Sequence, residues 1–308
     1  MNEAVLQVPI VVGLLLTCLL GPAIAIAMLL LRKRWARQRR RSPLGIDLLR
    51  GPGHTLRDQI EEATNDLSSD IFVLMLFPLL IVAVFLAQAH VRGLQGMVPL
   101  LPIYVAAVLA VVAWVVRGLW RASSRLDNLR TGYDAEVAVG QELDQLMRQG
   151  AAVFHDFPAD GFNIDHVVIS RCGVFAVETK GFTKPGDQRG RAGATVTYNG
   201  EALSFPRRST REPLEQAERQ AAWLAKWLGN STGEPVPVVP VLALPGWFVD
   251  RKGRGPVRVY SGKELAGLLD AKGVAGPSEE AIRRISHQVE QRCRTVAPRY
   301  GGRSTDTR

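Results

Sequence analysis

The sequence predicts an α/β chain in which three transmembrane helices precede a mixed-sheet domain with flanking helices. Two observations lead to this fold class. Apolar residues make up 47% of the 308-residue chain, and they are concentrated in its first 120 positions. Further along, short runs rich in β-branched residues alternate with amphipathic stretches of helical period, as expected of one sheet covered by helices. We therefore expect a membrane region followed by a single domain of about 150 residues.

The membrane region is predicted at residues 1–120, from segments that carry no charged side chain. Each of these segments is close to the ~20 residues needed to cross a bilayer. They cover residues 8–31, 71–89 and 97–116. Between the first two lies the loop 32–70, in which a short helix is expected at residues 56–67. A cleaved signal peptide is the alternative for the first segment, but the residues before it are not basic.

Charge placement predicts the orientation of the chain. Residues 32–41 contain seven Lys or Arg, and further Arg residues follow the third apolar segment. By the positive-inside rule the N-terminus is outside, and the loop 32–70 and everything after about residue 117 are cytoplasmic. We expect a multi-pass protein of the cell (plasma or inner) membrane whose folded domain lies in the cytoplasm.

The net charge and the cysteines limit which partners and which cellular compartment can be expected. The basic run 32–41 is either a topology signal resting on anionic headgroups or a nucleic-acid patch, so the net charge of +9 only partly indicates a polyanionic ligand. Cys18, Cys172 and Cys293 show no disulfide or metal-ligand spacing. Their arrangement suits a reducing cytosol.

The folded domain is predicted at residues 121–275, and residues 276–308 are expected to add a C-terminal helix and a disordered tail. Helices are predicted where apolar residues recur with helical spacing, at 134–148, 212–228, 263–270 and 278–295. Strands are predicted at 151–155, 164–170, 174–180, 237–244 and 257–260. Residues 194–205 predict a second hairpin turning at Asn199-Gly200, and residues 156–163 predict a loop.

Strands 164–170 and 174–180 form a tight hairpin that gathers the chemistry. If Arg171-Cys172 is the loop, Asp165 lies opposite Glu178; if Cys172-Gly173 is the loop, Asp165 lies opposite Lys180. Alternation puts all three side chains on one face in either register. Both strands are otherwise nearly all apolar, and buried charges are costly unless they are paired or bind a metal. The hairpin therefore predicts a metal site, the alternative being ordinary polar residues at a strand end.

Five segments carry a family resemblance. They are GYDAEVAVGQEL, NIDHVVIS, GVFAVETKG, EPLEQAERQ and VPVLALPG, and they fall between residues 132 and 270. Together they resemble the nuclease-related domain, a family of the PD-(D/E)xK phosphodiesterase superfamily. The resemblance implies a restriction-endonuclease-like mixed sheet. Ile164 stands where the superfamily has the proline of its name.

The resemblance also implies roles for particular residues. Asp165 and Glu178 are implied as ligands of Mg²⁺ or Mn²⁺, Lys180 as the catalytic amine, Glu136 as the acid of the first helix and Gln216 as an auxiliary polar residue. We expect burial near the cation to lower the pKa of Lys180 toward the range of a general base. The partners implied are the lipid bilayer and a nucleic acid, DNA rather than RNA.

The function implied is that of a membrane-anchored, metal-dependent hydrolase, an endonuclease that cuts nucleic-acid phosphodiester bonds on the cytosolic side. The alternative is a catalytically inactive membrane-tethered module of the same fold, which binds nucleic acid or a protein partner. Nothing in the composition separates the two.

Other polar and aromatic residues near the hairpin have two interpretations each. Loop cations either contact substrate phosphates or are simply solvated: Lys184, Arg189, Arg191, Arg207, Arg208 and Arg211. His155 and His166 are expected to be structural, since His166 points away from the face that carries Asp165. Trp223 and Trp227 are expected in the core rather than stacked on bases.

Overall fold

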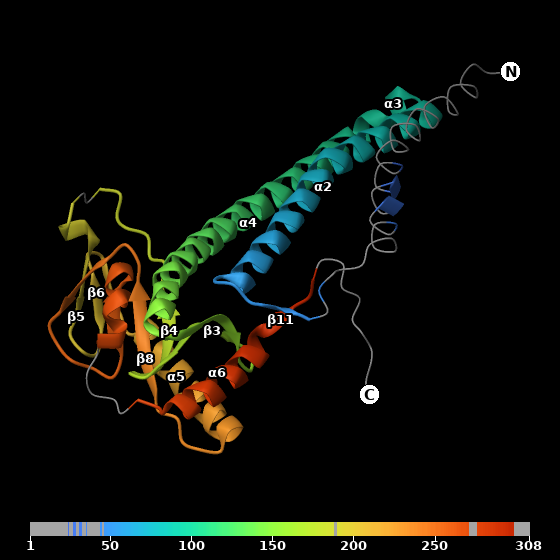
Figure 1. Cartoon of the computed structure of the whole chain (residues 1–308). Helices are drawn as coiled ribbons and strands as arrows, with labels where there is room; N and C mark the ends of the chain where they lie inside the picture. The colour runs from blue at the N-terminus through green and yellow to red at the C-terminus, as the bar shows by residue number, and fades with distance from the viewer. Residues whose placement is uncertain are drawn as a thin grey trace. The chain divides into compact units, whose positions relative to one another are not determined.

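The computed structural model of the chain describes residues 46–187, 190–270 and 276–298, with scattered positions between 24 and 44 (Figure 1). The chain divides into two compact units. The helical unit contains residues 1–45, 61–126 and 298–308, and the sheet unit contains residues 46–60 and 127–297. The sheet unit is therefore discontinuous in sequence.

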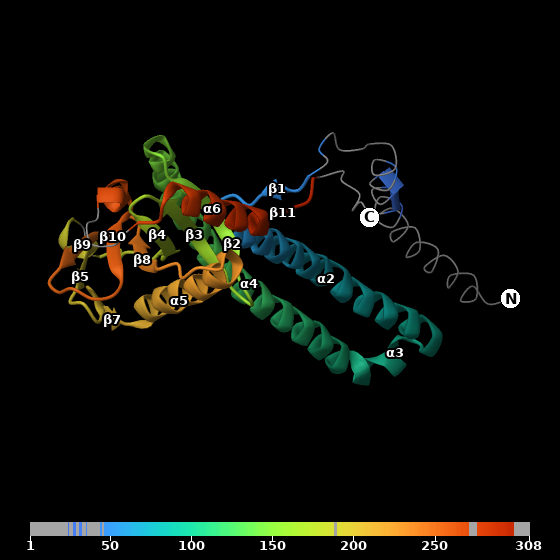
Figure 2. The same cartoon turned by 60° about the horizontal axis from the view of Figure 1, so that its bottom comes forward.

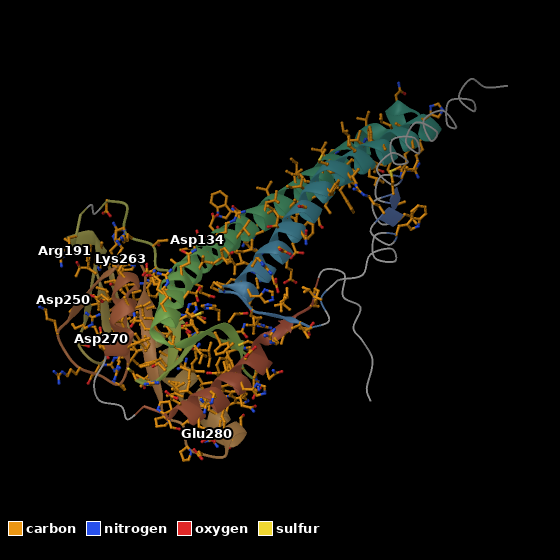
Figure 3. The ribbon with its side chains drawn as sticks, in the orientation of Figure 1. Asp134, Arg191, Asp250, Lys263, Asp270 and Glu280 are labelled. Carbon is orange, nitrogen blue, oxygen red and sulfur yellow. The ribbon has the colours of Figure 1, made fainter. Side chains whose placement is uncertain are left out.

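Two long helices dominate the helical unit. Helix α2 (His54–Arg92) and helix α4 (Leu101–Asp144) are joined by the short α3 (Leu94–Met97) and η1 (Val98–Leu100). Phe85 on α2 meets Tyr104 on α4 edge to face, with ring centroids 5.2 Å apart. Side chains project outward along both helices (Figure 3), and many large apolar ones are more than half exposed.

Both helices are long and apolar enough to cross a membrane, and their most apolar windows are 0% and 6% buried within the structure. A core helix of a water-soluble fold has these windows mostly covered. The predicted segments 71–89 and 97–116 lie within these helices. The predicted segment 8–31 falls almost entirely outside the described residues.

The two helices are longer than the sequence predicted. The separate helix expected at 56–67 is continuous with the second apolar segment, and the helix expected at 134–148 continues from the third. The junctions contain polar residues but no proline. Their hydroxyl groups form hydrogen bonds within the helix, where Ser68 and Ser69 donate to the backbone carbonyls of Thr64 and Asn65 at 2.9 and 3.1 Å. Polarity alone therefore does not end either helix.

A five-stranded mixed sheet forms the centre of the sheet unit, in the order β10-β8-β4-β3-β2. Its strands are β2 (Ala152–Pro158), β3 (Asn163–Ser170), β4 (Gly173–Thr179), β8 (Val238–Leu244) and β10 (Arg258–Ser261). Strands β2, β3 and β4 are antiparallel, whereas β8 runs parallel to both β4 and β10. Asp165 and Glu178 lie on the inner strands β3 and β4. The loop expected at 156–163 is shorter, because β2 extends to Pro158.

Helices cover both faces of this sheet (Figure 2). Helices α5 (Glu212–Thr232) and α6 (Glu279–Cys293) pack on one face, where Leu224 and Ile285 join one apolar cluster with Val167. On the other face, Leu143 and Leu265 join Phe175 in a second cluster. Leu143 lies at the end of α4, which is followed by η2 (Gln145–Gln149), and Leu265 lies in η4 (Gly262–Asp270).

A second sheet has the order β7-β6-β5-β9. It is built from β5 (Thr195–Tyr198), which follows η3 (Ala192–Ala194), and from β6 (Leu203–Phe205), β7 (Arg208–Thr210) and β9 (Phe248–Arg251). The predicted turn is confirmed: Asn199 Oδ1 accepts the backbone N–H groups of Glu201 and Ala202, and Gly200 takes φ 99°. Strand β9 was not predicted, because the strand has only four residues and most of them are polar or exposed.

The segment 46–60 packs into the sheet unit through two sets of backbone and polar contacts. Strand β1 (Leu48–Leu49) pairs with β11 (Arg294–Val296), which follows α6. Asp156 accepts hydrogen bonds from Arg50 Nη1 at 2.9 Å and from the hydroxyl and amide of Thr55 at 2.7 and 3.2 Å. These contacts fix the first turn of α2 against β2.

Candidate active site

The β3–β4 hairpin has the first of the two predicted registers. Ser170 pairs with Gly173 and His166 with Val177, so Arg171-Cys172 is the loop and the next position places Asp165 opposite Glu178. The backbone ladder stops at this position. Instead, Asp165 Oδ2 accepts the backbone N–H of Thr179 at 2.7 Å. The strand ends are thereby joined through the Asp165 carboxylate.

Glu178 and Lys180 form an ion pair at the end of β4. Lys180 Nζ lies 2.7 Å from Glu178 Oε1. The Glu178 side chain is only 3% exposed and the Lys180 side chain 28% exposed. The other carboxylate oxygen, Glu178 Oε2, is buried and has no hydrogen-bond partner. A buried, unpartnered carboxylate oxygen is costly and marks a place where a cation is favourable.

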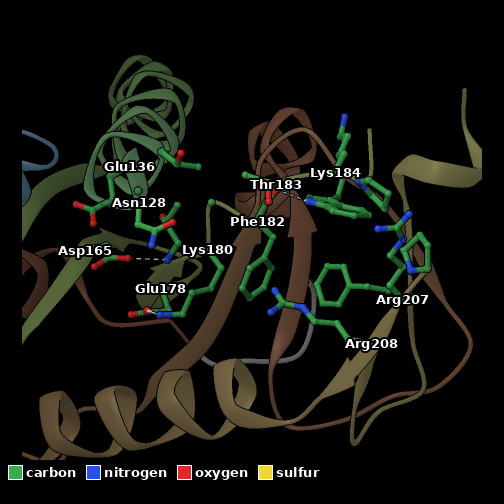
Figure 4. Close-up of a pocket in the computed structure, with 18 of the residues that line it drawn as sticks. Asn128, Glu136, Asp165, Glu178, Lys180, Phe182, Thr183, Lys184, Arg207 and Arg208 are labelled. Atoms are coloured by element: carbon green, nitrogen blue, oxygen red, sulfur yellow. Dashed lines mark hydrogen bonds and ion pairs between the residues drawn. The ribbon is translucent and has the colours of Figure 1, made fainter. Parts of the chain in front are cut away.

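A cleft of about 830 Å³ opens over this ion pair (Figure 4). All five residues predicted for the site line it: Asp165, Glu178, Lys180, Glu136 and Gln216. Glu136 comes from α4, the hairpin supplies the next three, and Gln216 comes from the first turns of α5. The structure therefore brings together residues that lie up to 80 positions apart in the sequence.

Close packing fixes the helix that carries Glu136. A Cβ built on Gly181, just after Lys180, would lie 2.7 Å from the Thr131 carbonyl oxygen and 2.8 Å from Ala135 Cβ. Only glycine allows the end of β4 to approach α4 this closely. Gly181 thus sets the separation between Lys180 and the helix bearing Glu136.

The carboxyl groups of the cleft repel one another. Burial, and then the charges of Glu178 and Glu136, raise the pKa of Asp165 well above its ordinary value. Burial, and then the charges of Asp156 and Glu178, raise the pKa of Glu136 to about 8. A divalent cation between such groups relieves both effects, because it replaces repulsion by attraction.

The expectation for the pKa of Lys180 concerns the site with a bound cation; in the protein alone the pKa shifts the other way. Burial lowers the pKa of Lys180, but the charges of Glu178 and Asp165 and the Glu178 hydrogen bond outweigh it, so the pKa is raised. Desolvation and a bound cation both lower the pKa of this amine, whereas the Glu178 carboxylate in direct contact raises it. Without a cation, contact with the Glu178 carboxylate therefore favours the charged ammonium form of Lys180.

The donor set fits a magnesium or manganese ion that keeps water ligands better than it fits a metal ion whose ligands all come from the protein. Within the described residues, no group of three or more His, Cys, Asp and Glu is placed to hold a metal ion. Mg²⁺ typically binds one or two carboxylates and takes its remaining ligands from water and substrate oxygens. Asp165 and Glu178 both line the cleft, and Glu178 Oε2 has no partner within the described residues, which matches that pattern.

A comparison with protein families decides what kind of domain this is. The family described as the nuclease-related domain matches residues 131–245. This part of the chain is a nuclease-related domain. The match includes every residue of the site described above. No curated protein and no solved structure matches the chain.

The packing of the nuclease-related domain extends beyond the matched residues on both sides. Leu56, from the segment 46–60, lines the cleft, and its Cδ1 lies 3.2 Å from a Cβ built on Gly132. Ile285 and Val289 of α6 belong to the apolar cluster beneath β3. The domain that folds around the site is therefore larger than the family match.

The histidines and tryptophans lie where a structural role predicts them. His155 Nδ1 and His166 Nδ1 are 2.9 Å apart, and His155 Nε2 is 3.0 Å from Asp144 Oδ1. Both histidines are buried on the side of the sheet away from Asp165. Trp223 and Trp227 pack edge to face on Phe157, with centroids 6.2 and 5.1 Å away.

The loop cations divide into two groups. Lys184, Arg207 and Arg208 line the cleft, whereas Arg191 stacks on Phe248 and Arg211 pairs with Glu201 at 3.0 Å. Arg189 lies outside the described residues. The sequence reasoning did not identify the aromatic residues beside these cations, Phe182, Phe205 and Trp247. A signal was present, since Phe182 directly follows the ETKG strand end and Phe205 directly precedes Pro-Arg-Arg.

Proposed function

We propose that this chain is a membrane-anchored nuclease that hydrolyses nucleic-acid phosphodiester bonds, DNA rather than RNA, with the help of Mg²⁺ or Mn²⁺. The observation that carries the proposal is the convergence of Asp165, Glu178 and Lys180 on one cleft of a nuclease-related domain. The unpartnered Glu178 Oε2 supports it, because a purely structural ion pair would satisfy both oxygens.

The chain's own residues divide the work of such a reaction. Asp165 and Glu178 would hold the metal ion, and the Thr179 N–H fixes Asp165 for that task. When bound, the ion supplies Lewis-acid polarisation of the phosphoryl group and a more acidic water. Lys180, an ammonium at neutral pH, is held by Glu178 and can donate to an oxygen that gains charge as the phosphorus becomes five-coordinate.

Two further side chains frame the reacting group. Glu136 faces Glu178 and Lys180 from α4, close enough for their charges to affect its pKa. Gln216 reaches the cleft from α5 and offers an amide that can orient a water or a phosphate oxygen. Their roles are positional, since neither is joined to the Asp165–Glu178 pair by a described hydrogen bond.

Anchoring in the cell membrane is part of the proposal. The large apolar side chains of α2 and α4 are exposed along most of both helices, and a lipid environment is the solvent in which such surfaces are stable. The basic run 32–41 favours the cytoplasm as the side on which the nuclease-related domain lies.

The test uses the full chain purified in a neutral detergent, because a fragment that starts after the helices lacks residues 46–60. Single- and double-stranded DNA and RNA are incubated with Mg²⁺, with Mn²⁺ or with EDTA. We expect metal-dependent cleavage that falls at least about 100-fold in Asp165→Asn and in Lys180→Ala. Arg219→Ala, an exposed residue of α5 outside the cleft, is the control that should keep full activity.

Two results would count against this function. Cleavage that survives in Asp165→Asn would place the chemistry elsewhere or in a contaminant. Nucleic-acid binding without cleavage, under every metal condition, would favour the inactive membrane-tethered module instead.

A further inference from the structure

The cleft has two ends of opposite charge. Figure 4 shows Glu136, Asp165 and Glu178 toward one side and Lys184, Arg207 and Arg208 toward the other. Phe182 lies between the two groups in the same view. The cationic end plays no part in the reaction proposed above, and its side chains are arranged by contacts of their own.

Aromatic rings hold Arg208 in place at the cationic end. Its guanidinium carbon lies 4.2 Å from the ring centroid of Phe182 and 5.4 Å from that of Phe205. Phe182 and Phe205 meet edge to face at 5.0 Å, and Phe205 meets Trp247 at 4.9 Å. We call these three rings the aromatic shelf.

The aromatic shelf is itself anchored. Trp247 is buried, and its Nε1–H donates to the Phe182 carbonyl oxygen at 3.0 Å. Stacking against a fixed ring reduces the rotamer freedom of an arginine while leaving its N–H groups free in the guanidinium plane. Arg208 is therefore preorganised to donate to a flat, two-oxygen face such as that of a phosphate.

Two of the three cations at this end, Lys184 and Arg208, are not neutralised by a described carboxylate. Lys180 is paired with Glu178, and Arg207 is paired with Asp187. Among the described residues, no carboxylate pairs with Lys184 or with Arg208, and Lys184 makes no side-chain hydrogen bond. Two exposed cations beside a cleft, one of them fixed by stacking, form a site for an anion rather than a stabilising ion pair.

We propose that Arg208 and Lys184 bind a backbone phosphate of a polynucleotide, next to the phosphate at the acidic end of the cleft. This inference rests on the proposed function, which it deepens by assigning residues that hold a second phosphate of the same substrate. A ligand that fills both ends carries at least two phosphates, so the preferred substrate is a nucleic-acid strand rather than a small phosphodiester. The aromatic shelf holds Arg208 and does not stack bases, so the contact is independent of sequence.

An anionic bilayer is the competing ligand for exposed cations on a membrane-anchored protein. A lipid surface is flat, and it would meet cations that project from the domain. Arg208 and Lys184 instead line a concave cleft that also contains three carboxyl groups, which a sheet of anionic headgroups would avoid. The shape and charge of the cleft favour a strand.

The test measures binding without turnover. The full chain in neutral detergent, with EDTA, is titrated with a fluorescent oligonucleotide, single- and double-stranded, over a series of KCl concentrations. We expect Arg208→Ala to weaken binding about 10-fold and to reduce the slope of log K against log[KCl] by about 0.7 for a single strand or 0.9 for a duplex. Lys184→Ala should reduce the slope by a similar amount.

A matched pair of variants separates charge from geometry. Arg208→Lys keeps the charge but not the planar fork, so it should retain the wild-type slope while binding more weakly. Arg219→Ala removes a cation outside the cleft that faces Glu215, and it should change neither quantity. All three positions are exposed, so the variants are expected to fold, which thermal unfolding checks.

The outcome distinguishes this inference from the nuclease proposal. If the wild-type chain does not cut but Arg208→Ala and Lys184→Ala weaken binding as stated, the phosphate site stands and the nuclease proposal falls. If the wild-type chain cuts and the Lys184→Ala/Arg208→Ala double variant binds with unchanged affinity and slope, the phosphate site falls and the nuclease proposal stands. The inference is also overturned if the wild-type chain binds no oligonucleotide. It is likewise overturned if Arg208→Ala and Lys184→Ala weaken binding only to phosphatidylglycerol vesicles and leave oligonucleotide binding unchanged.

Discussion

Asp156 gives the sharpest test of how the sheet unit is held together. Its neighbours His155 and Phe157 pair with His166 and Ile164, which places Asp156 opposite Asp165, yet no pair forms there. Asp156 has φ 49° and is the described non-glycine residue with positive φ. The left-handed backbone turns the carboxylate out of a row that already contains Asp165 and Glu178, and Arg50 neutralises it at 2.9 Å.

The expected magnitudes follow from burial and backbone geometry. Asp156 is 3% exposed and the Arg50 side chain 19%, so deleting one partner leaves a largely covered charge. We expect Asp156→Gly to lower the free energy of unfolding by about 3 kcal/mol. Asp156→Ala should cost ~1 kcal/mol more, because alanine is strained at positive φ whereas glycine is not. Asp156→Asn should cost only ~1 kcal/mol, since asparagine tolerates this φ and keeps an acceptor for Thr55.

The assay is urea unfolding of the full chain in detergent, followed by tryptophan fluorescence. Trp223, Trp227 and Trp247 lie in the sheet unit, and replacing Trp35, Trp114 and Trp120 by Phe removes signal from the helical unit. The order Asn, Gly, Ala in increasing cost supports the reasoning. Equal stabilities for the Gly and Ala variants would refute the strain, and an Ala variant within about 0.5 kcal/mol of wild type would refute the anchoring role itself.

Two further predictions concern the buried histidines and the glycine beside the site. Burial, and then the charge of His155, lower the pKa of His166 well below its ordinary value. As the pH falls, the unfolded chain therefore binds a proton at this position before the folded chain does. The stability due to neutral His166 is complete above pH ~6.5 and is lost below it, by up to ~1.4 kcal/mol per pH unit. The unfolding free energy of His166→Leu, measured by the same fluorescence assay, should therefore depend less on pH than that of wild type between pH ~7 and ~5, and an identical dependence would contradict this. Gly181→Ala should lower stability by about 1–3 kcal/mol and reduce cleavage, because its Cβ meets the Thr131 carbonyl of α4. Gly186→Ala, a cleft position with nothing within 4 Å of the new Cβ, is its control, and equal effects at both glycines would show that α4 is free to move.

The hairpin could be predicted from the sequence because its determinants are local. Side chains alternate with period 2, so Asp165 shares a face with Glu178 and Lys180 whether the loop is Arg171-Cys172 or Cys172-Gly173. A three-residue loop would have broken this register unless a bulge restored it. The apolar flanks of the strands then implied burial. Local pattern and loop length were sufficient to place three of the site residues.

The contacts of residues 46–60 could not be predicted in the same way. Arg50 and Asp156 are 106 positions apart, and they meet through polar atoms that leave no hydrophobic period in either segment. In the sequence, residues 46–60 read as part of a loop between membrane segments. Their place beside the site depends on β1 pairing with β11 and on one left-handed aspartate, neither of which has a local signature.

The discontinuity of the sheet unit restricts how the chain can cross a membrane. Residues 46–60 and 127–297 belong to one compact unit, so the residues between them must leave and return to the same side. An even number of crossings satisfies this, and the two apolar helices of residues 61–126, which we propose as the membrane anchor, would provide two. A single crossing would separate Arg50 from Asp156 by the thickness of the bilayer. The polar cluster around Asp156 and the pairing of α2 with α4 therefore support the topology that we propose, in which residues 61–126 are an insertion between two parts of one sheet unit.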